Sequence, residues 1–356
     1  MSAPTRRVPV PPSLATVAAR VETRLQQVLD DERRRWAELD TDIVAPLESL
    51  ERLVMAGGKR LRPAFCHWGH VGLGGDPDSP ACIDAGAAFE LLQAFALVHD
   101  DVMDGSATRR GERTAHLDFA DRHGDERWRG EGRRFGEGVA ILIGDLAHVY
   151  ADRLMSHAPP AATAVWHELR IELNVGQYLD VLGTARADTD LERARRIARY
   201  KSGKYTIERP LHVGAALAGD DGGAQAALSA YGDPLGEAFQ LRDDLLGAFG
   251  DEERTGKPVG DDLREGKPTP LLAIATARAG TEQLEVLELV GSPELAPADV
   301  EAIQAVFRDT GAVTEIEATI DALTEQAIAA IDRAPVTDEA KSALVDLAQY
   351  VAWRDR

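Results

Sequence analysis

The pattern of apolar and polar positions predicts a chain built almost entirely from helices. Apolar residues recur every three or four positions, the spacing that places them on one face of an α-helix. The first long example reads "SLATVAARVETRLQQVLDDERRRWAEL". Further helices are predicted over 42–56, 60–73, 80–103, 137–157, 160–186, 191–202, 205–218 and 223–249, with four or five more between Thr269 and Trp353. We find no strand-like alternation of useful length, so the sequence predicts an all-α fold.

The domain organisation follows from composition along the chain. No shift in composition marks a domain boundary within the 356 residues, so we expect one helical domain over residues 13–356. Residues 1–12 carry several prolines and no apolar signal core, and we expect them to form a disordered leader.

Two segments interrupt the helical rhythm, one over residues 105–136 and the other over residues 250–268. Each follows a predicted helix that ends in an aspartate pair. Because long irregular loops inside a compact domain are usually functional or mobile, both segments are candidates for binding a ligand.

Composition excludes several classes of protein. Apolar residues make up 44% of the chain, and the formal net charge is -20. This charge argues against binding to nucleic acid or to an anionic membrane, because phosphate would be repelled overall. No stretch reaches 18 uncharged apolar residues, so we expect no stable membrane insertion and a cytoplasmic location.

The first acid cluster follows the apolar run "LLQAFALVHD" and contains Asp100, Asp101 and Asp104. Asp100 and Asp104 stand one helical turn, ~5.4 Å, apart on one face. They also stand at a helix C-terminus, where the helix dipole is unfavourable to anions. A solvated helix end is one interpretation. Since the preceding helix is buried in character, we favour a Mg²⁺ site that also takes substrate phosphate oxygens.

The second cluster, Asp243 and Asp244 in "FQLRDDLLGAFGD", again follows an apolar helix and precedes an irregular segment. Gly247 stands where a third acid would complete a second DDxxD pattern. Ligands from two helices allow two or three Mg²⁺ ions to bridge one diphosphate.

Cations accompany both clusters and could hold two anionic groups. They are Lys59, Arg60 and Arg62 in "GGKRLRP", Arg109 and Arg110, Lys201 beside Ser202, and then Lys257 and Lys267. Arginine offers phosphate a bidentate fork and lysine a point charge. Each group alone could be solvated surface charge. Together with the acids and an apolar helical cavity, they suit an enzyme that joins two substrates with diphosphate heads and hydrocarbon tails.

Seven motifs in this order resemble those of the trans-isoprenyl diphosphate synthases, the polyprenyl synthetase family. They are "GGKRLRP", "HDDVMD" with "TRRG", "GD" at 144–145, "GQYLD" at 176–180, "YKSGKY" at 200–205, "FQLRDD" at 239–244 and "TGKPVGDDLREGK" at 255–267. The resemblance spans about residues 50–273 and implies an orthogonal helical bundle around a central cavity, usually a homodimer. It implies a Mg²⁺-dependent condensation of isopentenyl diphosphate with an allylic diphosphate.

The resemblance also assigns roles to individual residues. Three Mg²⁺ ions are implied on the allylic diphosphate, two on Asp100 and Asp104 and one on Asp243, with Asp101 and Asp244 in support. The residues implied to bind the allylic diphosphate are Arg109, Lys201 and Lys257. Those implied to bind isopentenyl diphosphate are Gly58, Lys59, Arg62, Gln93 and Arg110. Those implied to stabilise the allylic cation are the Lys201 carbonyl, Ser202 and Gln240, and Lys267 lies in an implied flap.

Three positions depart from the family pattern: Gln93 is often His, Ser202 is usually Thr, and Gly247 replaces an Asp. Product length depends on the helix before Asp100. Ala96, one turn earlier, leaves room, and Phe89, roughly 16 Å earlier, could be a floor for a C15 to C20 chain. The family associates a bulky residue at Phe95 with shorter products, but a helical wheel points Phe95 away from Asp100. We favour geranylgeranyl diphosphate as product, with farnesyl diphosphate next.

Two other functions remain open on sequence alone. A class I terpene synthase would share the fold but needs no second diphosphate site, and the "GGKRLRP" motif, Gln93 and Arg110 argue against it. A non-catalytic partner subunit would be expected to lose its metal-binding aspartates, and this chain retains them.

Overall fold

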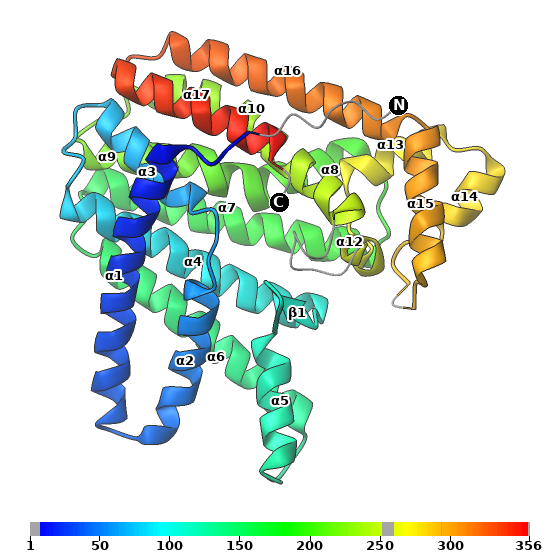
Figure 1. Ribbon diagram of the computed structural model, residues 1–356, viewed down its shortest axis with the longest axis horizontal. Helices are drawn as coiled ribbons and strands as arrows, with labels where there is room; N and C mark the ends of the chain where they lie inside the picture. Colours follow the sequence, from blue (N-terminus) through cyan, green and yellow to red (C-terminus); the bar gives the residue numbers. More distant parts are fainter. Residues whose placement is uncertain (1–7, 251–259, 293, 355–356) are drawn as a thin grey trace. The chain divides into compact units, whose positions relative to one another are not determined.

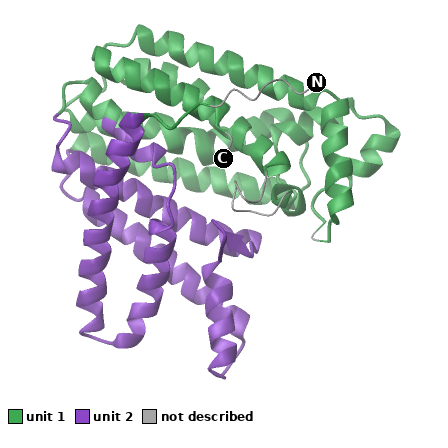
Figure 2. Cartoon of the chain, viewed as in Figure 1, with its two compact units in different colours: residues 1–11, 68–75, 160–356 green, residues 12–67, 76–159 purple. Residues whose placement is uncertain are grey.

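Helices account for most of the residues that the computed structural model describes, which are residues 8–250, 260–292 and 294–354 (Figure 1). The prediction of an all-α chain is confirmed. The chain divides into two compact units, coloured separately in Figure 2. Unit 1 comprises residues 1–11, 68–75 and 160–356, and unit 2 comprises residues 12–67 and 76–159. The extent of the single domain expected over 13–356 stays a prediction.

Unit 2 contains the first half of the helices and a short hairpin. Its elements are α1 (Pro12–Ala37), η1 (Thr41–Ile43), α2 (Val44–Met55), most of α3 (Leu61–Gly72), α4 (Pro80–Asp104), β1 (Thr108–Arg109), β2 (Glu112–Arg113), α5 (Ala115–Asp125) and α6 (Gly132–Met155). Helix α4 packs against α6, α1 and α2. Because α4 has neighbours on several sides, it is apolar around most of its circumference rather than along one stripe.

Helix α4 is also the one helix among the described residues that is long and apolar enough to cross a membrane. Within the structure, 61% of its most apolar window is buried. Helices in the core of soluble proteins pass the same test of length and composition.

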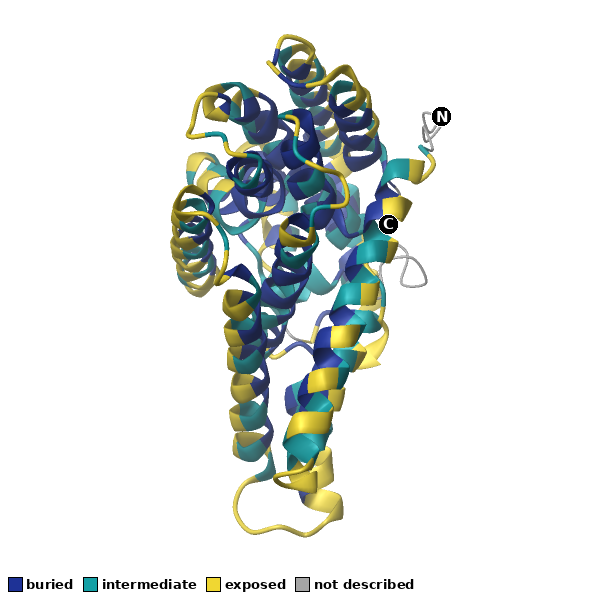
Figure 3. Ribbon diagram, turned by 90° about the vertical axis from the view of Figure 1, so that its left-hand side faces the viewer, coloured by how far each residue is buried: buried dark blue, intermediate teal, exposed yellow. Residues whose placement is uncertain are grey.

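Unit 1 contains α7 (Pro160–Ala185), α8 (Leu191–Ile197), η2 (Ala198–Glu208), α9 (Arg209–Leu217), α10 (Gln225–Phe249), α12 (Asp261–Glu265), α13 (Pro270–Arg278), α14 (Thr281–Leu287), α15 (Pro297–Asp309), α16 (Ala312–Asp332) and α17 (Asp338–Trp353). Helix α10 contacts η2, α16 and α17. An apolar core that includes Leu241, Leu245 and Phe307 packs around its C-terminal half. Figure 3 shows the resulting pattern, in which long helices are buried on one side and exposed on the other.

The structure corrects two expectations about local structure. Residues 105–136, expected to be irregular, contain the β1–β2 hairpin and α5, whose apolar residues pack against α6. The helix break expected between Ser202 and Tyr205 was wrong, because η2 continues through these residues as a π-helix. The leader expected over residues 1–12 falls partly outside the described residues, and α1 begins at Pro12.

Candidate active site

Two aspartates lie on one face at the C-terminal end of α4. Asp100 and Asp104 are separated by one turn, and both are partly buried, with 14% of the Asp100 side chain exposed. The helix ends because Gly105 adopts a left-handed conformation at φ 68°. Two carboxylates at the negative end of a helix dipole repel each other, and a bound cation would relieve this repulsion.

Asp101 points instead to Arg109. The Arg109 guanidinium donates from Nε to Asp101 Oδ1 at 2.8 Å and from Nη2 to the same oxygen. Its Nη2 also lies 3.9 Å from Asp100 Oδ2. Arg109 therefore neutralises the middle acid of the cluster and stands beside the first.

Two arginines in the hairpin after α4 contact different parts of unit 2. Thr108 pairs with Arg113 and Arg109 pairs with Glu112, and the turn between them has positive φ at Arg110 and Gly111. This is the two-residue turn that matches the twist of paired strands. Arg110 Nη1 donates to the carbonyl oxygen of Leu53 at 2.8 Å and to that of Gly57 at 2.5 Å. The hairpin thus connects the end of α2 with the end of α4.

Positive charge accumulates around Arg110. Burial lowers the pKa of Arg110, and the nearby cations Arg60, Arg109 and Arg62 lower it further. Gly58, at φ 149°, lets the guanidinium approach the backbone, since a side chain there would meet Arg110 Nη2 at 3.3 Å. An anion bound here would stabilise the charged form of Arg110.

The other residues of "GGKRLRP" have different environments. Arg60 is buried and ion-paired with Glu22 at 3.1 Å and with Glu90, which gives it a structural role. Lys59 and Arg62 are half-buried. Gln93, also half-buried, stands two turns before Asp100 on the same face of α4.

The second acid cluster lies near the C-terminal end of α10 in unit 1. Asp244 is 6% exposed, and its Oδ1 accepts a hydrogen bond from Gln240 Nε2 at 2.7 Å. Burial raises the pKa of Asp244 to about 8, and the charges of Asp262, Asp243 and Asp180 contribute to the increase. Its Oδ2 has no hydrogen-bond partner among the described residues. The surroundings of Asp244 therefore disfavour its charged form.

Arg354, near the end of the chain, contacts Asp243. Its Nη2 donates to Asp243 Oδ1 at 2.5 Å and to the carbonyl oxygen of Phe239 at 3.3 Å, and the guanidinium lies 4.3 Å from the centre of the Phe239 ring. The Arg354 side chain is 1% exposed, whereas that of Asp243 is 37% exposed. Sequence reasoning missed Arg354, because no spacing rule relates residues 111 positions apart.

A different aspartate lies beside the position where the second DDxxD pattern lacks its third acid. A side chain at Gly247 would stand 1.7 Å from Asp262 Oδ2, on helix α12. Asp262 therefore brings a carboxylate to the place beside Asp244 that Gly247 leaves open. The sequence pattern indicates only that Gly247 replaces an acid, and Asp262 was not among the predicted site residues.

The predicted lysines of unit 1 pair with carboxylates. Lys201 Nζ lies 2.6 Å from Asp180 Oδ2, and Asp180, the last residue of "GQYLD", is 5% exposed. Lys267 lies 3.6 Å from Asp262 and also pairs with Glu265. Ser202 is half-buried. Lys257 lies outside the described residues.

The three residues predicted to set product length differ in their surroundings. Phe89 is fully buried in the interior, and Ala96 is half-buried. Phe95 contacts two histidines, with its ring centre 4.7 Å from those of His99 and His148. His148 belongs to α6, so Phe95 faces α6, whereas Phe89 and Ala96 share the face of Asp100.

The acid clusters fit Mg²⁺ by the chemistry of their donors. Among the described residues, no three His, Cys, Asp or Glu side chains converge on one point. Mg²⁺ needs no such cage, because it binds through one or two carboxylates together with substrate phosphates and water. The pair Asp100 and Asp104 in unit 2 suits this mode. Burial and the charges of three neighbouring aspartates raise the pKa of Asp244 in unit 1, and a divalent cation would offset that negative charge.

Comparison with known proteins supports a common origin along most of the chain. A model of the family described as polyprenyl synthetase matches residues 46–308. The geranylfarnesyl diphosphate synthase of Aeropyrum pernix is 34% identical over 312 residues, covering 85% of this chain and 92% of that protein. The geranylgeranyl diphosphate synthase of Mycobacterium tuberculosis is 32% identical over 314 residues, covering 86% and 83%.

Solved structures share the fold as well. The geranylgeranyl pyrophosphate synthase of Corynebacterium glutamicum, complexed with isoprenyl diphosphate and magnesium, superposes with a TM-score of 0.91. It is 38% identical, and the match covers 96% of this chain and 99% of that chain. The fold is therefore the all-α isoprenoid synthase fold. By sequence and by structure, the chain belongs to the polyprenyl synthetase family and is a trans-prenyltransferase.

Proposed function

We propose that this enzyme condenses isopentenyl diphosphate with an allylic diphosphate, releases diphosphate, and makes a trans-prenyl diphosphate of C15 to C20. Geranylgeranyl diphosphate is the proposed product. The proposal rests on two separate groups of residues within unit 2. One is the Asp100 and Asp104 carboxylates, and the other is a cluster of cations around Gly58 and Arg110. One group suits a metal-bound diphosphate, and the other suits a diphosphate held directly.

Three Mg²⁺ ions are proposed, held by Asp100, Asp104 and Asp243. When bound, Mg²⁺ supplies positive charge that stabilises the departing diphosphate. The family's solved structures support a divalent metal, since one contains magnesium and another, from Caulobacter crescentus, contains calcium.

The side chains divide the work on the two substrates. Arg109, Lys201 and Lys257 are proposed to hold the allylic diphosphate. Gly58, Lys59, Arg62, Gln93 and Arg110 are proposed to hold isopentenyl diphosphate. Because contacts within the protein hold Arg109, Arg110 and Lys201 in place, these cations would stabilise charge as it develops without reorganising.

Oxygen atoms of unit 1 are proposed to stabilise the allylic cation. Because the Gln240 amide nitrogen donates to Asp244, the amide oxygen is the end left to face a cation. The Ser202 hydroxyl and the Lys201 carbonyl are the other proposed oxygens. The departing diphosphate takes the final proton, so the proposal needs no dedicated histidine or glutamate.

The functional test is incubation of the purified chain with Mg²⁺, labelled isopentenyl diphosphate and each allylic primer, followed by chain-length analysis. We expect elongation to C15–C20. Products formed from an allylic diphosphate without isopentenyl diphosphate would favour a class I terpene synthase. No turnover with any C5–C15 primer would favour a non-catalytic partner subunit.

Product length has its own test. We expect Phe89→Ala to lengthen the product, because Phe89 shares the face of Asp100. Phe95→Ala should leave product length unchanged, because the Phe95 ring packs on His148 of α6. If neither variant lengthens the product, or if Phe95→Ala does so, the proposed floor at Phe89 is wrong.

A homodimer is proposed from the surface of α7. Ile171, Val175 and Tyr178 recur at helical spacing and are 59%, 47% and 65% exposed. An exposed apolar stripe of this kind marks a protein interface, and the family supports a second copy of the chain as its occupant. Val175→Asp combined with Tyr178→Asp should convert dimer to monomer in sedimentation velocity. A wild-type chain that sediments as a monomer would contradict the proposal. A cytoplasmic location is also proposed, because no stretch of the sequence reaches 18 uncharged apolar residues.

A further inference from the structure

The segment that carries Lys201 and Ser202 has an uncommon backbone. Residues Ala198–Glu208 form a π-helix, and at its end the Arg209 N–H donates to the carbonyl oxygen of Lys204, five residues earlier. π-helical geometry usually lasts a single turn and is frequent at functional sites. A stretch of 11 residues needs surrounding structure to hold it.

Two neighbouring helices approach the backbone of η2 closely. A side chain at Gly176 of α7 would stand 2.4 Å from the Lys201 nitrogen, and one at Gly236 of α10 would stand 2.8 Å from the Gly203 Cα atom. The π-helix η2, which is wider than an α-helix, is therefore packed between α7 and α10 at Lys201 and Gly203. Backbone contact fixes where η2 lies, but it does not by itself fix how the helix is wound.

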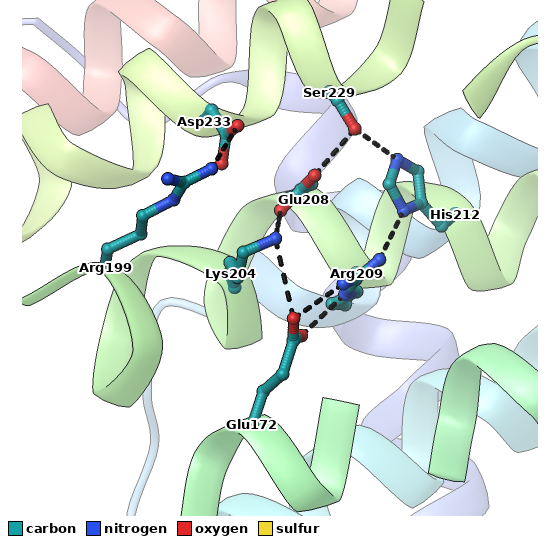
Figure 4. Close-up of polar contacts among 8 residues, drawn as sticks. All are labelled: Glu172, Arg199, Lys204, Glu208, Arg209, His212, Ser229 and Asp233. Carbon is teal, nitrogen blue, oxygen red and sulfur yellow. Dashed lines mark hydrogen bonds and ion pairs between the residues drawn. The ribbon is translucent and has the colours of Figure 1, made fainter. Parts of the chain in front are cut away.

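A buried set of charges connects η2 with the same neighbours, as Figure 4 shows. Lys204 Nζ lies 2.7 Å from Glu208 Oε2, one turn on, and 3.6 Å from Glu172 Oε1 of α7. Arg209 donates from Nε and Nη2 to the two oxygens of Glu172, each at 2.7 Å. Lys204, Glu208 and Glu172 are at most 9% exposed. We call Glu172, Lys204, Glu208 and Arg209 the buried quartet.

A second layer of hydrogen bonds keeps the quartet charged. Ser229 Oγ of α10 donates to Glu208 Oε1 at 2.6 Å and lies 3.2 Å from His212 Nε2. Although burial favours protonation of Glu208, the hydrogen bonds from Lys204 and Ser229 lower its pKa. Burial lowers the pKa of His212 to about 4, so the imidazole adds no charge at neutral pH. Two cations and two carboxylates leave the quartet neutral overall.

Stability alone does not explain three buried charges and a fourth, Arg209, whose side chain is 13% exposed. Replacing a buried ion pair by apolar residues of similar size is often neutral or stabilising, and the best-attested use of such groups is to specify one conformation. In this chain two members of the quartet, Lys204 and Glu208, belong to η2, and Arg209 follows directly. The contacts therefore act on the winding of the segment that carries Lys201 and Ser202.

We propose that the buried quartet is a positioning network: it holds η2 in its wide form and thereby aims the Ser202 hydroxyl and the Lys201 backbone at the allylic substrate. This inference rests on the proposed function. None of the four side chains is assigned to contact substrate. They act through η2, so their loss should slow the chemical step and leave binding of isopentenyl diphosphate unaffected, because the residues proposed to bind it lie in unit 2.

The test compares a single variant with a charge-balanced double variant. Lys204→Met leaves two carboxylates beside Arg209 and should lower the melting temperature by at least about 5 °C. Lys204→Met combined with Glu208→Gln removes one charge of each sign and keeps the Arg209–Glu172 pair. It should restore the melting temperature to within a few degrees (~3 °C) of wild type. Its kcat should still fall about 10-fold or more, with the KM for isopentenyl diphosphate unchanged.

A matched control uses an ion pair that joins the same segment to α10. Arg199 Nη2 lies 2.8 Å from Asp233 Oδ2, and the Arg199 side chain is 50% exposed. The Asp233 side chain is 34% exposed, so water screens this pair more than the quartet. Arg199→Met combined with Asp233→Asn should keep kcat within about twofold of wild type, because solvent-screened pairs contribute little. Amide hydrogen exchange over residues 198–208 should accelerate in the charge-balanced quartet variant and not in this control.

The outcomes separate this inference from the proposed function. An active wild type and a charge-balanced quartet variant with wild-type kcat and wild-type exchange would overturn the positioning network and leave the function standing. A wild-type chain that elongates no primer would overturn the function. Hydrogen exchange would then still report whether the quartet holds the winding of η2.

Discussion

The acid clusters of units 2 and 1 both place aspartates near the C-terminal end of an apolar helix. They differ in how far along the sequence the arginine that pairs with each cluster lies. In the α4 cluster, Asp101 pairs with Arg109, which is eight residues away on the adjoining hairpin. In the α10 cluster, Asp243 pairs with Arg354, which is 111 residues away. The first cluster is assembled locally, and the second depends on the folding of unit 1 as a whole.

The two clusters also differ in how much of their charge is compensated. Asp101 has a guanidinium on one oxygen. Among the described residues, Asp244 accepts a hydrogen bond from the Gln240 amide alone, and burial together with three other aspartates raises its pKa. The same pattern of acids thus holds its buried acid in an ion pair in one unit, and as a carboxyl with a raised pKa in the other. Five predictions test this difference, and those with the greatest effect come first.

Removing one proposed metal ligand from either cluster should have the largest effect. Asp100→Asn and Asp243→Asn should each lower kcat by roughly 10³-fold, because several kcal/mol of charge stabilisation is lost. Steady-state assays at saturating Mg²⁺ measure this. The melting temperature of Asp100→Asn should not fall, since a repelled carboxylate leaves the negative end of α4. Near-normal turnover in either variant would remove that cluster from the proposed mechanism.

Restoring the third acid of the second pattern should destabilise the protein rather than improve it. A side chain at Gly247 would overlap Asp262, so Gly247→Asp should cost about 3 kcal/mol in urea unfolding. Combining it with Asp262→Gly should recover most of that loss, because the carboxylate then comes from position 247 instead. A stable Gly247→Asp variant would mean that Asp262 does not occupy this place.

Neutralising the buried acid of each cluster should change stability in opposite directions. Asp101→Asn breaks the ion pair with Arg109 and should lower the free energy of unfolding by about 1–3 kcal/mol. Asp244→Asn removes a carboxylate whose pKa is raised, and without metal it should raise the melting temperature. Thermal unfolding of both variants without metal decides this, and the same sign for both would contradict the comparison.

The Asp244 effect should also depend on pH with a definite sign. Because the pKa of Asp244 is raised to about 8 in the folded state, the folded state retains a proton that the unfolded state loses near pH 4. Wild-type stability should therefore fall, relative to Asp244→Asn, as pH rises from about 4 to 8. A difference between the two proteins that is constant across this range would be inconsistent with the raised pKa.

The smallest predicted effect concerns Arg354. Arg354→Met should leave Asp243 without its orienting partner and raise the Mg²⁺ concentration for half-maximal activity by about 10-fold, equivalent to ~1.4 kcal/mol. Arg354→Lys, which keeps the charge, should shift it less. Mn²⁺ binding followed by electron paramagnetic resonance gives a reading that does not require turnover. Unchanged metal binding in Arg354→Met would assign Arg354 to packing of the C-terminus alone.

Much of the fold and half of the candidate site could be predicted from sequence. The helical pattern indicated nearly every helix, because the hydrogen bonds of an α-helix connect residues four apart and its buried face repeats every three or four residues. The same locality placed Asp100 and Asp104 on one face and set Arg109 beside them. The winding of η2 was missed, since a π-helix depends on its packing against α7 and α10 and leaves no periodic signature.

The sequence by itself determined the all-α class, the two aspartate pairs and the family. Tertiary structure decided which carboxylate each cation neutralises, with Arg354 reaching Asp243 and Asp262 lying beside Gly247. It also decided that Phe95 faces α6, that Lys204 pairs with Glu208, and that Arg209 pairs with Glu172 of α7. The physical reason is distance along the chain. Periodicity and capping act over a few residues, whereas charge pairing and close backbone packing depend on segments that meet only after the chain has folded.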